Sequence, residues 1–205
     1  LGDGDFTHTG ISNSRNDIVE TVSNYVSSKN LHLKYKGQGV DYVVIQKETG
    51  KRWRSDFNSN WLTAQFRNLG LEKADCYSKF IPEEYKLGSP EQRLELLQGL
   101  LDTDGWVQKG IAKYSTTSNQ LAKDVKEIVG SLGGVAFIST RKKKRTETEK
   151  VEHIVTVRLP ETFNPFKLER KMKKVKSLYH RLSRKIAKIE IVGKDQMQCI
   201  KVSAE

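Results

Sequence analysis

The feature that most constrains the fold is a helix–strand–strand–helix pattern that occurs twice, offset by roughly one hundred residues. An acidic glycine turn opens each copy: Leu1–Gly4 reads Leu-Gly-Asp-Gly, and Leu101–Gly105 reads Leu-Asp-Thr-Asp-Gly. Asp3 and Asp104 lie 101 residues apart, which matches the offset. In both copies apolar residues recur at helical spacing and then alternate as in strands. The sequence therefore predicts an α+β fold of two pseudo-symmetric halves.

Three regions are expected: a first half over 1–85, a second half over 86–188 and a terminal region over 189–205. The apolar spacing predicts helices over 17–28, 58–69, 90–101 and 118–132. It also predicts a hairpin, in which the strands Val135–Thr140 and His153–Leu159 flank an Arg141–Lys150 loop. A long basic helix is expected over Phe166–Ala187, and a strand-like segment over Ile189–Val202.

Charge narrows the range of partners. The 205 residues include 36 Lys+Arg and 25 Asp+Glu, a net charge of +11, and the segment Arg141–Lys188 alone holds 17 basic and 5 acidic residues. Such a surface favours a polyanion, because each neutralised phosphate releases counterions; a solvated face that aids solubility is the alternative. No apolar run reaches the ~18–20 residues of a membrane helix. Two cysteines, Cys76 and Cys199, exclude a disulfide-rich scaffold and favour a reducing compartment.

The segment Leu97–Gly105 combines an apolar helix with an internal glycine and an acidic end. Gly99 costs helix stability, which is understandable if another helix packs closely against it. Asp104 falls at the helix C-terminus, where the helix dipole disfavours a carboxylate. A bound cation would offset that cost; an ordinary helix ending in an Asp-Gly turn is the alternative.

Several short segments, spread over nearly the whole chain, form a set of motifs that occur in a fixed order. These segments are Leu1–Gly4, Lys79–Tyr85 with Arg93, Leu96–Gly105, Tyr114–Ser118, Leu121–Ala122, Leu132–Gly134 and Gln198–Val202. Together they resemble the LAGLIDADG homing endonucleases found inside inteins. The last of them is similar to the beginning of the C-terminal splicing region.

The resemblance implies a monomer of two αββαββ halves, with saddle-shaped antiparallel sheets placed over the major groove of double-stranded DNA. It implies that Asp3 and Asp104 are catalytic, each binding Mg²⁺ or Mn²⁺, with Asp102 and Asp5 as second choices. Hard divalent cations prefer oxygen ligands, and phosphodiester cleavage needs an activated water and a stabilised leaving oxygen.

Family enzymes also carry basic residues near the scissile phosphates. Lys79 matches a lysine that precedes an Ile-Pro pair between the halves, and Lys171, with Lys167 close behind, is the expected counterpart. DNA contacts are expected from basic residues of the sheets and their surroundings, namely Lys34, Lys36, Lys113, Arg141, Lys143, Arg158 and Lys167.

The first motif is represented by Leu1–Gly4 alone, so its helix is expected to be truncated. The N-terminal nucleophile block and the C-terminal His-Asn pair of an intein are missing from the sequence, so this chain is not expected to splice alone. Two alternatives remain open: a relative that binds DNA or RNA without cleaving it, and a fragment of a protein-splicing element. The expected location is the cytoplasm or nucleus, wherever the host gene product is made.

Overall fold

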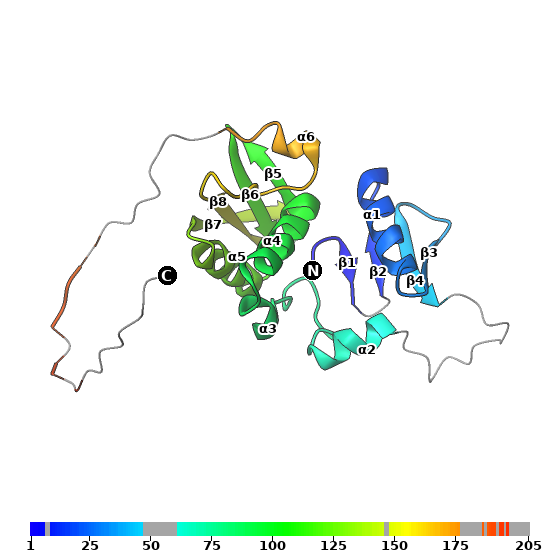
Figure 1. The fold of residues 1–205 in the computed structure, drawn as a ribbon, viewed down its shortest axis with the longest axis horizontal. Helices are drawn as coiled ribbons and strands as arrows, with labels where there is room; N and C mark the ends of the chain where they lie inside the picture. Colours follow the sequence, from blue (N-terminus) through cyan, green and yellow to red (C-terminus); the bar gives the residue numbers. More distant parts are fainter. Residues whose placement is uncertain are drawn as a thin grey trace, which may run out of the picture.

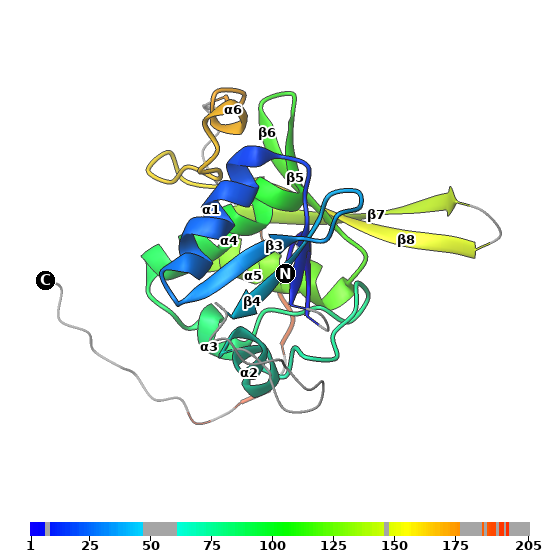
Figure 2. The same cartoon turned by 90° about the vertical axis from the view of Figure 1, so that its right-hand side faces the viewer.

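The computed structural model describes residues 1–6, 9–46, 61–145 and 148–176, together with 186, 188–191, 193–194 and 196. Within these residues the fold consists of two four-stranded antiparallel sheets with helices, arranged as two halves (Figures 1 and 2). The predicted α+β class and the two-half plan are therefore confirmed. None of the described helices is long and apolar enough to cross a membrane.

The first sheet has the strand order β1-β2-β4-β3. Its elements are β1 (Gly4–Asp5), β2 (Gly10–Ser12), α1 (Asn16–Ser27), β3 (Leu31–Tyr35), β4 (Asp41–Gln46) and α2 (Trp61–Asn68). Leu31 and Leu33 alternate with exposed His32 and Lys34 along β3, so one face of the sheet packs against α1 and the other is open.

The second sheet has the order β5-β6-β8-β7 and a larger core. Its elements are α4 (Pro90–Asp104), β5 (Gly105–Gln108), β6 (Ile111–Thr116), α5 (Asn119–Ser131), β7 (Val135–Arg145), β8 (Thr148–Arg158) and α6 (Glu169–Met172), with α3 (Glu83–Lys86) before them. Both long helices cover the same face of this sheet. A Ser89–Gln92 capping box begins α4, and the Ser118 hydroxyl caps α5.

The β7–β8 hairpin is longer than predicted, because the expected loop over 141–150 continues the two strands. Arg141 of β7 lies opposite Glu152 of β8, and their side chains form an ion pair at 2.7 Å. Opposite charges in register stabilise a strand pair. The described part of the segment expected as a loop, 141–145 and 148–150, therefore belongs to a strand ribbon that projects from the sheet (Figure 2).

The predicted helix over 166–187 is wrong in the part that the structure describes, where the helix spans Glu169–Met172. Phe166 is buried in the second core, and the Lys176 N–H donates to the Gly110 carbonyl instead of continuing a helix. The remainder, 177–185 and 187, lies outside the described residues. The predicted second helix is found over Trp61–Asn68, and the described residues of 189–202 form no strand.

Candidate functional site

The two acidic turns meet where the halves join. Asp104 is the last residue of α4, and Asp3 immediately precedes β1. A side chain at Gly2 would collide with Thr103, and its Cβ would lie 3.2 Å from Asp104 Oδ2. Glycine is therefore required at position 2 for the first turn to approach the end of α4. The structure thus brings together the two acids that the sequence selected.

The Asp104 carboxyl is partly buried and is hydrogen-bonded to that of Asp3. Burial, followed by the charge of Asp3, raises the pKa of Asp104 to about 6, although nearby Lys79 opposes the shift. Asp3 is held in turn by Asn13, whose amide nitrogen donates to Asp3 Oδ2 at 2.5 Å. Two carboxyl groups held this close repel each other when ionised, which is the condition that a cation relieves.

Lys79 joins the two halves beside this acid pair. Its Nζ donates to the carbonyl oxygens of Gly2 and Gly4, each at 2.9 Å. Its own segment is anchored on the second half, where Ser118 donates to the Lys79 carbonyl at 2.6 Å and the buried Asp124 accepts the Ile81 N–H at 2.8 Å. Burial lowers the pKa of Lys79, and the neighbouring acids limit that shift.

Lys171 has the corresponding place at the end of α4. Its Nζ donates to the carbonyls of Leu101, Asp102 and Gly105 at 2.8, 2.6 and 2.7 Å. An ammonium has three N–H donors, so all three are used. Burial lowers the pKa of Lys171 to about 8, despite the nearby Asp102.

Asp102, a second choice as a metal ligand, is turned away from the acid pair. Its carboxylate accepts the backbone N–H of Lys167 at 3.0 Å and that of Leu168 at 3.2 Å. It therefore fixes the segment that carries Lys171. Asp5, the other second choice, is exposed in β1.

The expected DNA contacts fall into three groups. Lys34 and Lys36 follow the open side of the first sheet, and Lys113, Arg141 and Arg158 lie on the open face of the second. Arg141 also pairs with Glu152 at 2.7 Å. Lys143 opposes Lys150 in the β7–β8 register, and its side chain lies outside the description. Lys167 stands apart from both sheets and pairs with Glu95 at 2.9 Å.

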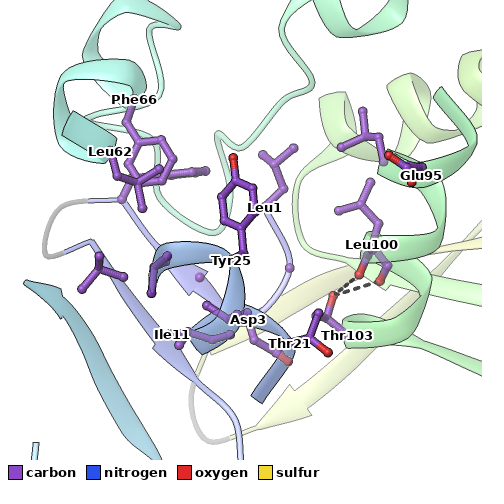
Figure 3. Close-up of a pocket in the computed structure, with 18 of the residues that line it drawn as sticks. Leu1, Asp3, Ile11, Thr21, Tyr25, Leu62, Phe66, Glu95, Leu100 and Thr103 are labelled. Atoms are coloured by element: carbon purple, nitrogen blue, oxygen red, sulfur yellow. Dashed lines mark hydrogen bonds between the residues drawn. The ribbon is translucent and has the colours of Figure 1, made fainter. Parts of the chain in front are cut away.

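A cavity of about 910 Å³ separates α4 from the first half (Figure 3). Leu100 and Glu95 line it from α4, while Tyr25, Leu62 and Phe66 line it from the first half. Among the described residues, no atom beyond the neighbouring residues and backbone of α4 lies within 4 Å of a Cβ built at Gly99. The helix expected to pack there is the one of which the sequence contains Leu1–Gly4 alone, so that packing stays a prediction. The close approach to α4 in the described residues occurs at Gly2.

A second cavity, of about 510 Å³, opens beside Asp3. Its lining includes the basic residues Arg15, Arg170, Lys171 and Lys174. Arg170 and Lys174 were not predicted as site residues, since their segment was expected to be a continuous helix. The anchoring roles of Ser118 and Asp124 were not predicted either. Both residues are buried, Ser118 as the N-cap of α5 and Asp124 within that helix. A polar residue on the apolar side of a predicted amphipathic helix is the signal that could have indicated Asp124.

The acid pair fits a magnesium-type cation in one specific way. Among the described residues, no group of three or more His, Cys, Asp or Glu side chains could hold a metal ion. Mg²⁺ keeps several waters and is commonly held by one or two carboxylates together with substrate phosphates. Asp3 and Asp104 supply two converging carboxyl groups, so the arrangement suits a cation that is completed by a phosphate.

Comparison with known proteins finds a family match within the second half. Residues 91–165 match the model of a LAGLIDADG-like domain. A replicative DNA helicase DnaB of Mycobacterium intracellulare is 41% identical over 112 residues, which cover 54% of this chain and 18% of the helicase. The chain thus matches less than a fifth of that relative's length.

Two solved structures are similar at lower identity. Mesophilic variants of the homing endonuclease I-DmoI match with a TM-score of 0.49 and 11% identity, over 73% of this chain and 72% of that one. I-DmoI in complex with DNA and Mn matches with a TM-score of 0.48 and 11% identity, over 72% of each chain. The resemblance expected from the sequence thus has its firmest support in the family match, which covers residues 91–165 of this chain.

Proposed function

We propose that this protein is a site-specific, metal-dependent endonuclease that hydrolyses both strands of a DNA target. The observation that carries the proposal is the meeting of Asp3 and Asp104, one acid from each half, at the junction of the two sheets. An acid from each half of a pseudo-twofold protein suits the two strands of a duplex, which are also related by a dyad.

Asp3 and Asp104 would hold Mg²⁺ or Mn²⁺. When bound, such a cation activates water and stabilises charge on the leaving oxygen. The protein's own contribution is to fix the two carboxyl groups: Asn13 orients Asp3, and the end of α4 fixes Asp104. The raised pKa of Asp104 means that its carboxyl holds a proton more tightly beside Asp3, and a cation bound between the two would lower that pKa and favour the carboxylate.

Among the described residues, the Lys79 Nζ donates to the carbonyls of Gly2 and Gly4 and lies 5.7 Å from the centre of the Phe6 ring. An ammonium has three N–H donors, so we assign the third to a phosphate oxygen of bound DNA. Lys171 uses all three on carbonyls, so we assign it the role of fixing the end of α4. The open sheet faces, with Lys34, Lys36, Lys113 and Arg158, would bind the duplex. Most of these contacts should go to phosphates and should weaken as salt is raised.

We also propose that the chain is embedded in an intein and acts on the uninterrupted gene of its host protein. The similarity to a replicative DNA helicase supports a helicase gene as that host. The protein would act as a monomer in the compartment where the host gene product is made, with residues 189–205 beginning a splicing region.

The decisive experiment incubates the full-length parent protein with plasmid carrying the uninterrupted helicase-gene junction, with and without Mg²⁺. A linear product that disappears with EDTA, and in Asp104→Asn, supports the proposal. Glu20→Gln, which neutralises an exposed acid of α1, is the matched control and should cleave normally. If the wild-type protein shifts this DNA but leaves it uncut in Mg²⁺, the protein is a binding-only relative and the endonuclease proposal is wrong.

A further inference from the structure

One large aromatic ring is exposed on the open face of the second sheet. Phe137 in β7 is 57% exposed, whereas its neighbour Ala136 is buried and Ile138 packs against the second core. Because side chains alternate along a strand, Phe137 points away from α4 and α5, onto the face that carries the basic residues. Packing of the core does not account for a phenyl ring at this position.

Strand register surrounds this ring with the polar or basic Ser139, Thr156 and Arg158 and with the apolar Val135 and Ile154. Thr156 lies directly opposite Phe137, and Lys113 lies opposite Thr156 on the next strand. Arg158 is two residues from Thr156 on the same face of β8 and pairs with Val135. We refer to Lys113, Phe137, Thr156 and Arg158 as the Phe137 patch.

The chemistry of the patch suits a DNA major groove. The patch holds two cations and a hydroxyl around an apolar ring. Of the groups that base pairs present in the major groove, the C5 methyl of thymine is the apolar one, and an aromatic side chain can contact it. Arg and Lys donate hydrogen bonds to the acceptor atoms of guanine, and a Thr hydroxyl can hydrogen-bond to several of the bases. The two basic side chains would attract the DNA phosphates, and the phenyl ring would favour a base that carries a methyl group over one that does not.

We propose that Phe137 is a specificity-determining residue that contacts the methyl group of a thymine, with Arg158 and Lys113 at neighbouring phosphate or guanine acceptors. This inference rests on the proposed DNA-binding function. It adds an apolar contact, and with it a preference for thymine, to a surface whose other expected contacts are made by basic side chains. Loss of one buried methyl group corresponds to about a fourfold change in affinity.

The test uses the full chain and two forms of the uninterrupted junction duplex, in EDTA so that the DNA stays intact. One duplex contains thymine, and in the other every thymine is replaced by deoxyuracil, which lacks only the methyl group. The wild-type protein should bind the uracil duplex about fourfold more weakly. Phe137→Ser should bind the two duplexes equally, and Phe137→Leu should keep much of the difference because it restores an apolar contact.

Tyr77→Ser is the matched control, because it removes an aromatic ring of similar exposure from the connector between the halves. It should discriminate between the duplexes as the wild type does. Equal binding of the two duplexes by the wild type, or an equal loss in Phe137→Ser and wild type, would overturn the thymine contact while leaving DNA binding intact. Binding of neither duplex by the wild type would instead refute the proposed function.

Discussion

The two lysines beside the acidic turns have different amounts of freedom. Lys171 is saturated by three carbonyls at the end of α4, whereas Lys79 donates to two carbonyls of the first turn. The segment of Lys171 is also fixed by Asp102, and the repeat offset places Leu1 at the equivalent position of the first half. The first half therefore lacks this aspartate.

The halves also differ in what supports them. Among the residues that the structure describes, the core of the second half contains sixteen buried residues and the cluster under the first sheet contains four. Lys79, which serves the first turn, is anchored through Ser118 and Asp124 of the second half. The second half is thus the scaffold on which both lysine segments are mounted, and the first turn depends on it for its position.

The largest expected effect is on cleavage. Asp3→Asn and Asp104→Asn should each reduce formation of linear product by more than about 100-fold, because loss of a metal ligand should cost at least as much as loss of a supporting residue. Cleavage kinetics on the plasmid substrate measure both variants against Glu20→Gln. A variant at either acid that still linearises the plasmid at the wild-type rate would show that the two halves are not equivalent in their use of the acids.

Thermal unfolding as a function of pH isolates Asp104. Its pKa is raised from 3.8 to about 6, so the folded state binds the proton more tightly than the unfolded state, and the stability conferred by that proton is lost as pH rises through this range. Between pH 4 and 6 the Tm of the wild type should therefore drop relative to that of Asp104→Asn, which does not titrate. At pH 7, Mg²⁺ should raise the Tm of the wild type more than that of the variant; an equal rise would contradict cation binding by Asp104.

Substituting the two lysines tests the difference in their freedom. Lys171→Met should lower the free energy of unfolding by about 3 kcal/mol, since it leaves carbonyls at the end of α4 without their donor. Lys79→Met should lower the free energy of unfolding by less than Lys171→Met does. Relative to that loss of stability, it should reduce the cleavage rate more strongly. Chemical denaturation and single-turnover cleavage of both variants provide the comparison. Equal destabilisation with equal loss of cleavage would mean that both lysines serve the same role.

How much of this could be predicted depended on whether a residue's role is local. The acidic turns, the strand alternation around Leu31 and Leu33, and the Ser89 helix start follow local rules, and the structure confirms them. The helix predicted over 166–187 failed because helical spacing competes with long-range bonds to Asp102 and Gly110, which no sequence window contains. The hydrogen bonds by which Ser118 and Asp124 anchor the Lys79 segment could not be predicted for the same reason, because their partners are about forty residues away in the sequence.

Asp102 provides a smaller effect within the second half. Asp102→Ala should cost about 2 kcal/mol of stability, because two backbone N–H groups near the protein interior lose their acceptor. Asp102→Asn keeps one carbonyl oxygen and should recover part of the loss. If both variants cleave normally at full stability, the link between Asp102 and the Lys171 segment has no role in holding the site.

The smallest expected effect is at the ion pair that joins α1 of the first half to α6. Arg170 Nε lies 3.1 Å from Asp17 Oδ2, and the two side chains are 35% and 41% exposed. Burial pushes the pKa of Asp17 upward, but the hydrogen bond from Arg170 brings the net shift downward, so the pair stabilises the fold above the ordinary pKa and loses its effect as pH falls. A double-mutant cycle of Asp17→Asn and Arg170→Gln should give a coupling of about 0.5 kcal/mol that shrinks with salt. A coupling several times larger would mean that this pair fixes the two halves together, and the contacts of Lys79 with Gly2 and Gly4 would then be secondary.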